Sequence, residues 1–96
     1  VVTVTTFGDE DATLAKGVNV ASANTSTTRT LTLPASAGLS AGDSVKVKVA
    51  GVSSGAVTIA RAGSQTIDGS LTSVVLESDN AAIELIYVAE DDWRIF

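Results

Sequence analysis

Two short runs of carboxylates are the residues in this sequence best suited to chemistry. Asp9-Glu10-Asp11 and Glu90-Asp91-Asp92 each place three acidic side chains in succession. Carboxylate oxygens bind hard cations such as calcium, so either run could hold one, including an ion shared at an oligomer axis. Adjacent turn residues rarely converge on a single ion, and no Asp-x-Asp-x-Asp-Gly loop is present. We therefore favour solvated turn acids that oppose aggregation, and we predict no metal and no other cofactor.

Nucleophilic catalysis has little support in this chain. The sequence contains no His and no Cys, which excludes a His-dependent triad, a thiol protease and an imidazole metal site within it. Serine is plentiful, and Lys16, Lys46 and Lys48 offer amines for a Ser-Lys dyad, but none of them has the spacing of such a motif. No Gly-rich phosphate loop leads into a helix. We predict that the chain is not an enzyme.

Two pairs of side chains are candidates for binding. Lys46 and Lys48 lie two residues apart on one strand face, where they could grip an acidic partner, although a hydrated sheet face is the simpler interpretation. Tyr87 and Trp93 could stack on a sugar ring. In a chain with only four aromatic residues, rings more often fill the core.

Composition narrows the range of partners. The net charge is −5 and the six Lys and Arg are scattered, so a phosphate backbone has no basic patch to bind, and we predict no nucleic-acid partner. The apolar stretches are only a few residues long, far short of the ~20 that span a bilayer, so we predict no membrane association. Without Cys, stability must come from packing or from neighbouring subunits.

The elements that would position these residues are strands. Thirty of the 96 residues are Val, Ile or Thr, which favours an all-β fold, and the length fits a single domain over residues 1–96. Residues 1–27 are predicted to be an N-terminal arm and loop region, with a strand-like arm over 1–6 and a loop over 7–17. Residues 28–96 are predicted to be the β core. The predicted strands cover residues 1–6, 18–23, 28–33, 44–49, 57–59, 71–77, 82–88 and 93–96.

Turn residues separate these strands at intervals of about ten residues. The turns are predicted at 52–55, Asp68-Gly69, Asp79-Asn80 and 90–92. Together these features predict a small antiparallel β-sandwich or jelly-roll-like barrel of about eight short strands.

The last two strands indicate self-association. One face of the strand over 82–88 carries Ile83, Leu85 and Tyr87, and the other carries Ile86 and Val88. Burying both faces requires a second layer or a neighbouring subunit, and small domains without disulfides often gain stability by oligomerising. The interface residues that we predict are Val2, Val4, Tyr87, Trp93 and Phe96. Phe96 is expected to be buried or against a neighbour, so extending the C-terminus should disturb assembly more than extending Val1.

The order of several short segments resembles the β domains of tailed-bacteriophage virion proteins, such as head-decoration subunits and tail-fibre segments. The segments are Thr30-Leu-Thr-Leu-Pro34, Ala41-Gly-Asp-Ser-Val45, Gly55-Ala-Val-Thr-Ile59, Thr66-Ile-Asp-Gly69, Ile83 to Val88 and Asp92-Trp-Arg-Ile-Phe96. The resemblance spans residues 28–96. It implies a structural role in the virion and an oligomer, commonly a trimer, and it carries over no catalytic residues.

A chain of this length is more similar to a decoration (cement) subunit than to a long, modular tail fibre. We therefore expect a subunit that is assembled in the host cytoplasm and binds the major capsid protein of the head lattice at symmetry or quasi-symmetry axes. The arm over 1–6 would pair with capsid or with a neighbour through edge-strand hydrogen bonds. The alternative is a tail-fibre or receptor- and carbohydrate-binding module that uses Tyr87, Trp93 and the lysine face.

Overall fold

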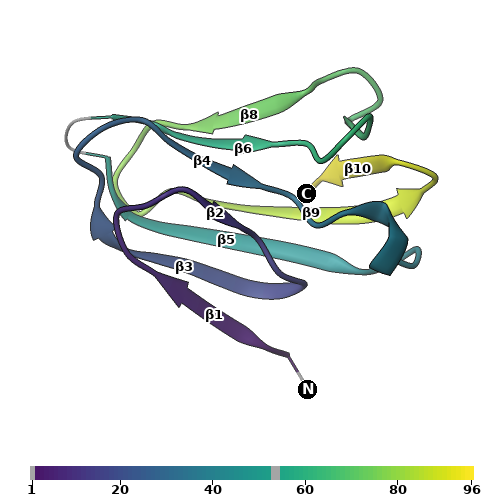
Figure 1. The fold of residues 1–96 in the computed structure, drawn as a ribbon, viewed down its shortest axis with the longest axis horizontal. Coiled ribbons are helices and arrows are strands. Elements are labelled where there is room, and N and C mark those ends of the chain that lie inside the picture. Colours follow the sequence, from purple (N-terminus) through teal and green to yellow (C-terminus); the bar gives the residue numbers. More distant parts are fainter. Residues whose placement is uncertain (1, 53–54) are drawn as a thin grey trace.

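The computed structural model describes residues 2–52 and 55–96, and within them the chain is mostly strand (Figure 1). Val1 of the expected arm and residues 53–54 of an expected turn lie outside the described residues. The strands in chain order are β1 (Val4–Phe7), β2 (Ala12–Thr13), β3 (Gly17–Asn24), β4 (Arg29–Thr32), β5 (Ser44–Gly51), β6 (Val57–Ala60), β7 (Thr66–Ile67), β8 (Ser73–Leu76), β9 (Ala82–Ala89) and β10 (Asp92–Ile95). One short 3-10 helix, η1 (Ser36–Gly38), follows β4. Among the described residues, no helix has the length and apolar character needed to cross a membrane.

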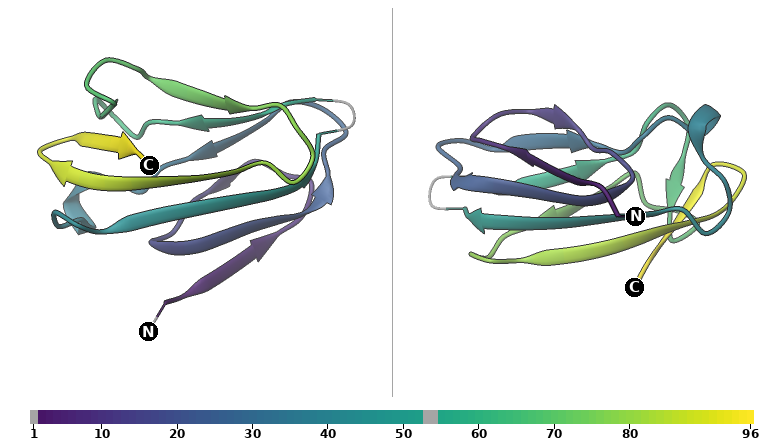
Figure 2. Two further views of the ribbon diagram at one scale, coloured as in Figure 1. Left: turned by 180° about the vertical axis from the view of Figure 1, so that it is seen from behind. Right: turned by 90° about the horizontal axis from the view of Figure 1, so that it is seen from below.

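The strands form two mixed sheets, and the chain alternates between them as far as β9. The six-stranded sheet has the order β1-β3-β5-β9-β10-β7, and the four-stranded sheet has the order β2-β4-β6-β8. Figures 1 and 2 show two layers, with β2 and β4 on one side and β3, β5 and β9 on the other. Hydrophobic side chains from both sheets form one buried cluster. The nearly all-β expectation is confirmed, and the arrangement is compatible with a small β-sandwich.

Antiparallel pairing, which we expected throughout, is wrong for most of the described strands, and these number ten instead of about eight. Five of their eight pairs are parallel. Only β5–β9, β9–β10 and β6–β8 are antiparallel. A parallel pair needs a crossover connection, and between β1 and β6 each crossover is a strand of the other sheet. Consecutive strands therefore face each other across the core, and each strand pairs with the one two places along the chain.

β5 and β9 form the centre of the six-stranded sheet. In β5, Val45, Val47 and Val49 are buried, whereas Lys46 and Lys48 are exposed, as the alternation predicts. β9 pairs antiparallel with β5 on one side and with β10 on the other. The predicted terminal hairpin is therefore confirmed, and it forms part of a larger sheet.

The N-terminal region contains more strand than we expected. β2 lies inside the predicted loop over 7–17, and Leu14, directly after it, belongs to the buried core. β3 is eight residues long and extends on both sides of the predicted strand over 18–23. At Gly17, with φ +100°, a Cβ would lie 2.5 Å from the carbonyl oxygen of Thr3. Glycine at this position therefore lets the N-terminal segment approach β3, an effect that strand periodicity does not reveal.

Three predicted turns occur where expected. Asp68 and Gly69 both have positive φ, and so do Asn80 and Asp91. Asp, Asn and Gly tolerate this conformation better than other residues do, which explains why composition located these turns correctly.

Candidate functional site

The three carboxylates of the first acidic run, residues 9–11, are kept apart because each binds a different group of the chain. The Asp9 carboxylate accepts hydrogen bonds from Arg29 Nε at 2.8 Å and from the backbone N–H and the hydroxyl of Ser26. These contacts, the Arg29 hydrogen bond foremost, hold the pKa of the Asp9 carboxyl well below its usual range. Asp11 accepts instead from the backbone N–H of Thr30, and Glu10 accepts from that of Gly8. Each of the three carboxylates therefore stabilises a different part of the loop.

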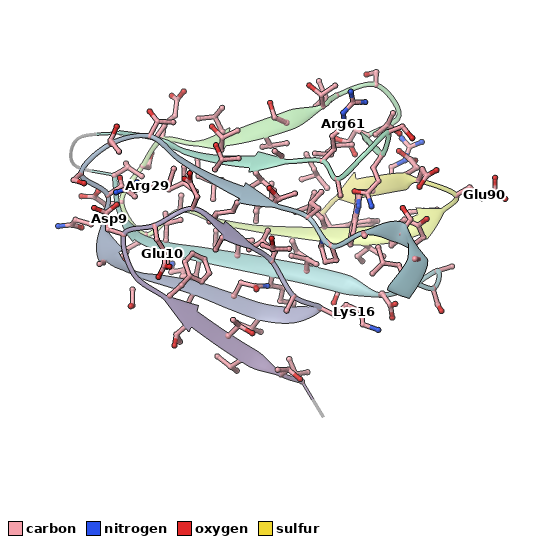
Figure 3. The ribbon with its side chains drawn as sticks, viewed as in Figure 1. Asp9, Glu10, Lys16, Arg29, Arg61 and Glu90 are labelled. Atoms are coloured by element: carbon pink, nitrogen blue, oxygen red, sulfur yellow. The ribbon has the colours of Figure 1, made fainter. Side chains whose placement is uncertain are left out.

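The second acidic run lies at the opposite end of the molecule from the first, as the positions of Asp9 and Glu90 in Figure 3 show. The Asp92 carboxylate accepts from the Thr66 hydroxyl at 2.8 Å, from the Gly69 N–H and from Arg94 Nε. The Thr66 hydrogen bond is the main cause of a lowered Asp92 pKa. Within the described part of the chain, no three His, Cys, Asp or Glu side chains gather as metal ligands.

Tyr87 and Trp93 pack against each other inside the molecule. Their rings meet edge to face with centroids 5.3 Å apart, and Trp93 is 0% exposed while Tyr87 is 7% exposed. Trp93 Nε1 donates to Gln65 Oε1 at 3.0 Å, and the Tyr87 hydroxyl accepts from the Asp91 N–H. Trp93 therefore has no surface to offer a sugar or a partner subunit, and Tyr87 has little.

Gln65 is a buried polar residue whose side-chain amide holds together the segments around Trp93. Its Oε1 also accepts from the Ala62 N–H, and its Nε2 donates to the carbonyl of Pro34 and to the hydroxyl of Ser36. The amide thus joins the β6–β7 turn, Pro34 and the first residue of η1, and Trp93 of β10. We did not predict this residue, because a single Gln in a polar turn gives no sign of burial.

The outer face of the six-stranded sheet, which points away from the four-stranded sheet, is the strongest candidate for binding. At residues 18–20 of β3 the usual polarity is reversed. Asn19 points inward and is 0% exposed, with its amide bonded to the backbone N–H and carbonyl of Ala15 and to the carbonyl of Lys46, while Val18 and Val20 lie on the opposite face. A sheet face that meets only water normally carries polar residues, so the two valines make this face more apolar than usual.

One row of residues crosses this face from β1, at one edge, as far as Phe96, which follows β10. The strand register places Val4 beside Val18, Val18 beside Lys46, and Lys46 beside Glu84. Phe96, whose N–H donates to the Glu84 carbonyl, continues the row. Lys46 Nζ and the Glu84 carboxylate form an ion pair at 3.9 Å. The row is therefore apolar at both ends and carries one cation and one anion between them.

Both ends of this row are largely exposed. Val4 is 63% exposed and Phe96 is 73% exposed. In the right-hand view of Figure 2, the C-terminal end leaves the layer of β9 on the side away from β2 and β4. The predicted interface residues thus separate into Val2, Val4 and Phe96, which are exposed, and Tyr87 and Trp93, which are not.

A shallow groove of about 410 Å³ lies along the same row. Its lining includes Val18, Ala82 and Phe96 together with Lys46, Lys48 and Glu84. The Lys48 ammonium donates to the Asn80 carbonyl, and the Lys46 ammonium pairs with Glu84, so both lysines expose their aliphatic stems to the groove. An apolar side chain fits this surface better than an acidic ligand does. Strand parity could have revealed the position of Phe96, since Arg94 and Phe96 alternate with Trp93 and Ile95.

Comparison of the sequence with protein-family models and with curated proteins finds no match.

Proposed function

We propose that this chain is a non-enzymatic structural subunit of a tailed-phage virion, built on a small β-sandwich, that self-associates and binds the head lattice as a decoration subunit. The similarity of residues 28–96 to virion β domains supports this class of protein. The oligomer implied by that similarity is a trimer, and measuring the mass of the protein in solution tests it.

The observation that carries the proposal is the exposed apolar character of the outer face of the six-stranded sheet. Val4 and Phe96 lie on this face with most of their surface open, and Val18 and Val20 lie between them. In the described residues, no metal-ligating cluster accompanies this face. Exposed apolar patches on small proteins mark interaction surfaces, so a protein neighbour is the partner that this face fits.

The free edge of β1 is suited to contact the capsid. Among the described strands, β1 is the first of its sheet and pairs with β3 only, and residues 2–8 carry no charge. Natural proteins usually protect a sheet edge with charge, proline or a bulge. An unprotected edge can add a strand from a partner through main-chain hydrogen bonds, as we expect for a capsid segment.

The carbohydrate-binding alternative gains no support from the aromatic residues. It relied on Tyr87, Trp93 and the lysine face, and the two rings lie in the core. Phe96 is an exposed ring on the outer face, but Lys46 and Lys48 beside it are already bound to Glu84 and to the Asn80 carbonyl.

Labelling of virions tests the proposed location. An antibody against the purified chain, applied to purified particles and viewed by electron microscopy, should label the head at many positions. Labelling confined to the tail tip would contradict the decoration role, and so would particles that lack the protein.

A pair of proline variants tests the proposed capsid contact. The Val18 N–H donates to the Thr3 carbonyl, so in this parallel register the N–H of Thr6 points to the free edge of β1. Thr6→Pro should preserve the fold and abolish binding to undecorated capsids in a sedimentation assay. Val75→Pro alters the free edge of β8 in the other sheet and should bind like the unmodified chain. Equal binding by both variants would exclude the β1 edge.

A further inference from the structure

The symmetry of the row across the six-stranded sheet identifies one partner for it. We infer that the outer face binds the same face of a second copy about a two-fold axis parallel to the strands, between β5 and β9. This inference rests on the proposed function, because it names the surface through which the subunit self-associates. It differs from the trimer that the sequence resemblance implies.

A two-fold axis at this place reverses the order of the row between the two copies. The row reads Val4, Val18, Lys46, Glu84, Phe96, with one residue from each of β1, β3, β5 and β9 and then Phe96, which directly follows β10. After reversal, Phe96 of one copy lies over Val18 of the other, with Val4 beside it. The exposed ring thereby meets the aliphatic lining of the groove, and the same contact occurs twice.

The charges in the row are complementary under the same operation. Lys46 of one copy lies over Glu84 of the other, and Glu84 lies over Lys46. Two sheets packed face to face are about 10 Å apart, a distance that these two long side chains can span together. A three-fold arrangement of this face would not bring opposite charges together in pairs. A net charge of −5 per chain opposes association in general, so local neutralisation favours this face over the acidic loops.

The area of the outer face sets the expected strength of the association between two copies. Three eight-residue strands flanked by the four-residue β1 and β10 cover at most about 20 by 26 Å. Specific interfaces typically cover about 800 Å² per partner, so this one is at the small end. We therefore expect association to depend on protein concentration within the range of ordinary measurements.

Sedimentation equilibrium over a concentration series tests the contact. The unmodified chain should fit a monomer–dimer equilibrium. Phe96→Ser should weaken dimerisation by about tenfold or more, because it removes the apolar anchor on both sides. Val75→Ser, an exposed valine of the other sheet, is the matched control and should leave dimerisation unchanged. Equal effects of the two variants would overturn the inference.

A charge exchange between copies provides a second test that does not depend on the anchor. Lys46→Glu and Glu84→Lys each give a row with two like charges, so each variant alone should be monomeric. An equal mixture should form a heterodimer, because the acidic row of one variant faces the basic row of the other. Native mass spectrometry distinguishes the three species, and a mixture that stays monomeric would overturn the inference.

The outcomes separate this inference from the proposed function. A trimer whose mass is unaffected by Phe96→Ser would overturn the two-fold contact but would leave a head-decoration role intact if the virion heads are labelled. A dimer with the expected variants, together with unlabelled virions, would support the contact and contradict the decoration role.

Discussion

The inner and outer faces of the six-stranded sheet are built from the same strands but differ in composition and in consequence. On the inner face, Val45, Val47, Leu85 and Trp93 are fully or almost fully buried. On the outer face, the same strands carry Lys46, which is paired with a carboxylate, and Phe96 is exposed beyond the end of β10. The difference indicates that the inner face supplies the stability of the monomer, while the outer face is available for association.

The largest loss of unfolding free energy should come from truncating a side chain of the inner face. Trp93→Ala removes a fully buried ring together with its contact to Tyr87 and its hydrogen bond to Gln65. We expect the free energy of unfolding to fall by about 3–5 kcal/mol, as measured by denaturant titration. A loss below about 1 kcal/mol would show that the inner face does not dominate stability.

The second-largest loss of unfolding free energy should come from disrupting the hydrogen-bond network around Gln65. Gln65→Leu leaves Trp93 Nε1, the Ala62 N–H and the Pro34 carbonyl without their buried partner. We expect a loss of about 2–4 kcal/mol in the same titration.

A double variant checks that this loss arises from the network. Adding Trp93→Phe to Gln65→Leu removes the indole N–H that has lost its acceptor. The two losses should therefore sum to more than the loss in the double variant. Strict additivity would contradict a shared network.

Acid should reveal the contribution of the loop carboxylates. The folded-state pKa of Asp9 lies below its value of about 3.9 in an unfolded chain, and Arg29 is the principal cause. The resulting stability is fully present above that unfolded value and is lost as the pH falls toward the folded-state pKa. We expect Asp9→Asn to flatten the acid limb of unfolding free energy against pH between about 4 and 2. Exposed Glu77→Gln is the control, and an unchanged slope in Asp9→Asn would refute the assignment.

The smallest effect on the monomer should come from the outer face. Phe96→Ala removes a ring that is 73% exposed, so at concentrations where the chain is monomeric the unfolding free energy should change by less than about 0.5 kcal/mol. A loss comparable with that of Trp93→Ala would mean that the two faces do not divide stability from association.

The features of the fold that were predictable from the sequence are the local ones. The alternation of Val45, Val47 and Val49 identified β5, and the Asp-Gly and Asp-Asn pairs located turns through their tolerance of positive φ. The pairing of strands was not predictable, because alternation specifies which side chains share a face and not which strand lies alongside. Parallel pairing between strands that cross from one sheet to the other does not change the two-residue period of the side chains, so the sequence pattern does not reveal it.

The candidate surface was only partly predictable for a similar reason. Val4 and Phe96 were predicted as interface residues, and the structure places both on the outer face, where their contact with a neighbour remains a prediction. The inward orientation of Asn19 depends on backbone groups of Ala15 and Lys46 that only the fold brings together. Without knowledge of that orientation, the sequence does not show that Val18 and Val20 of β3 point outward.

Cross-linking between isotopically distinguishable copies tests the self-association of the outer face most directly. Equal amounts of ¹⁴N- and ¹⁵N-labelled chains are mixed and treated with a carbodiimide, which joins lysine to carboxylate side chains at zero length. Peptides that join Lys46 to Glu84 are then read by mass spectrometry. The ion pair within one chain, at 3.9 Å, gives cross-links with a single label. The two-fold contact predicts an additional set that carries both labels and disappears in Phe96→Ser, whereas cross-links with single labels only would contradict it.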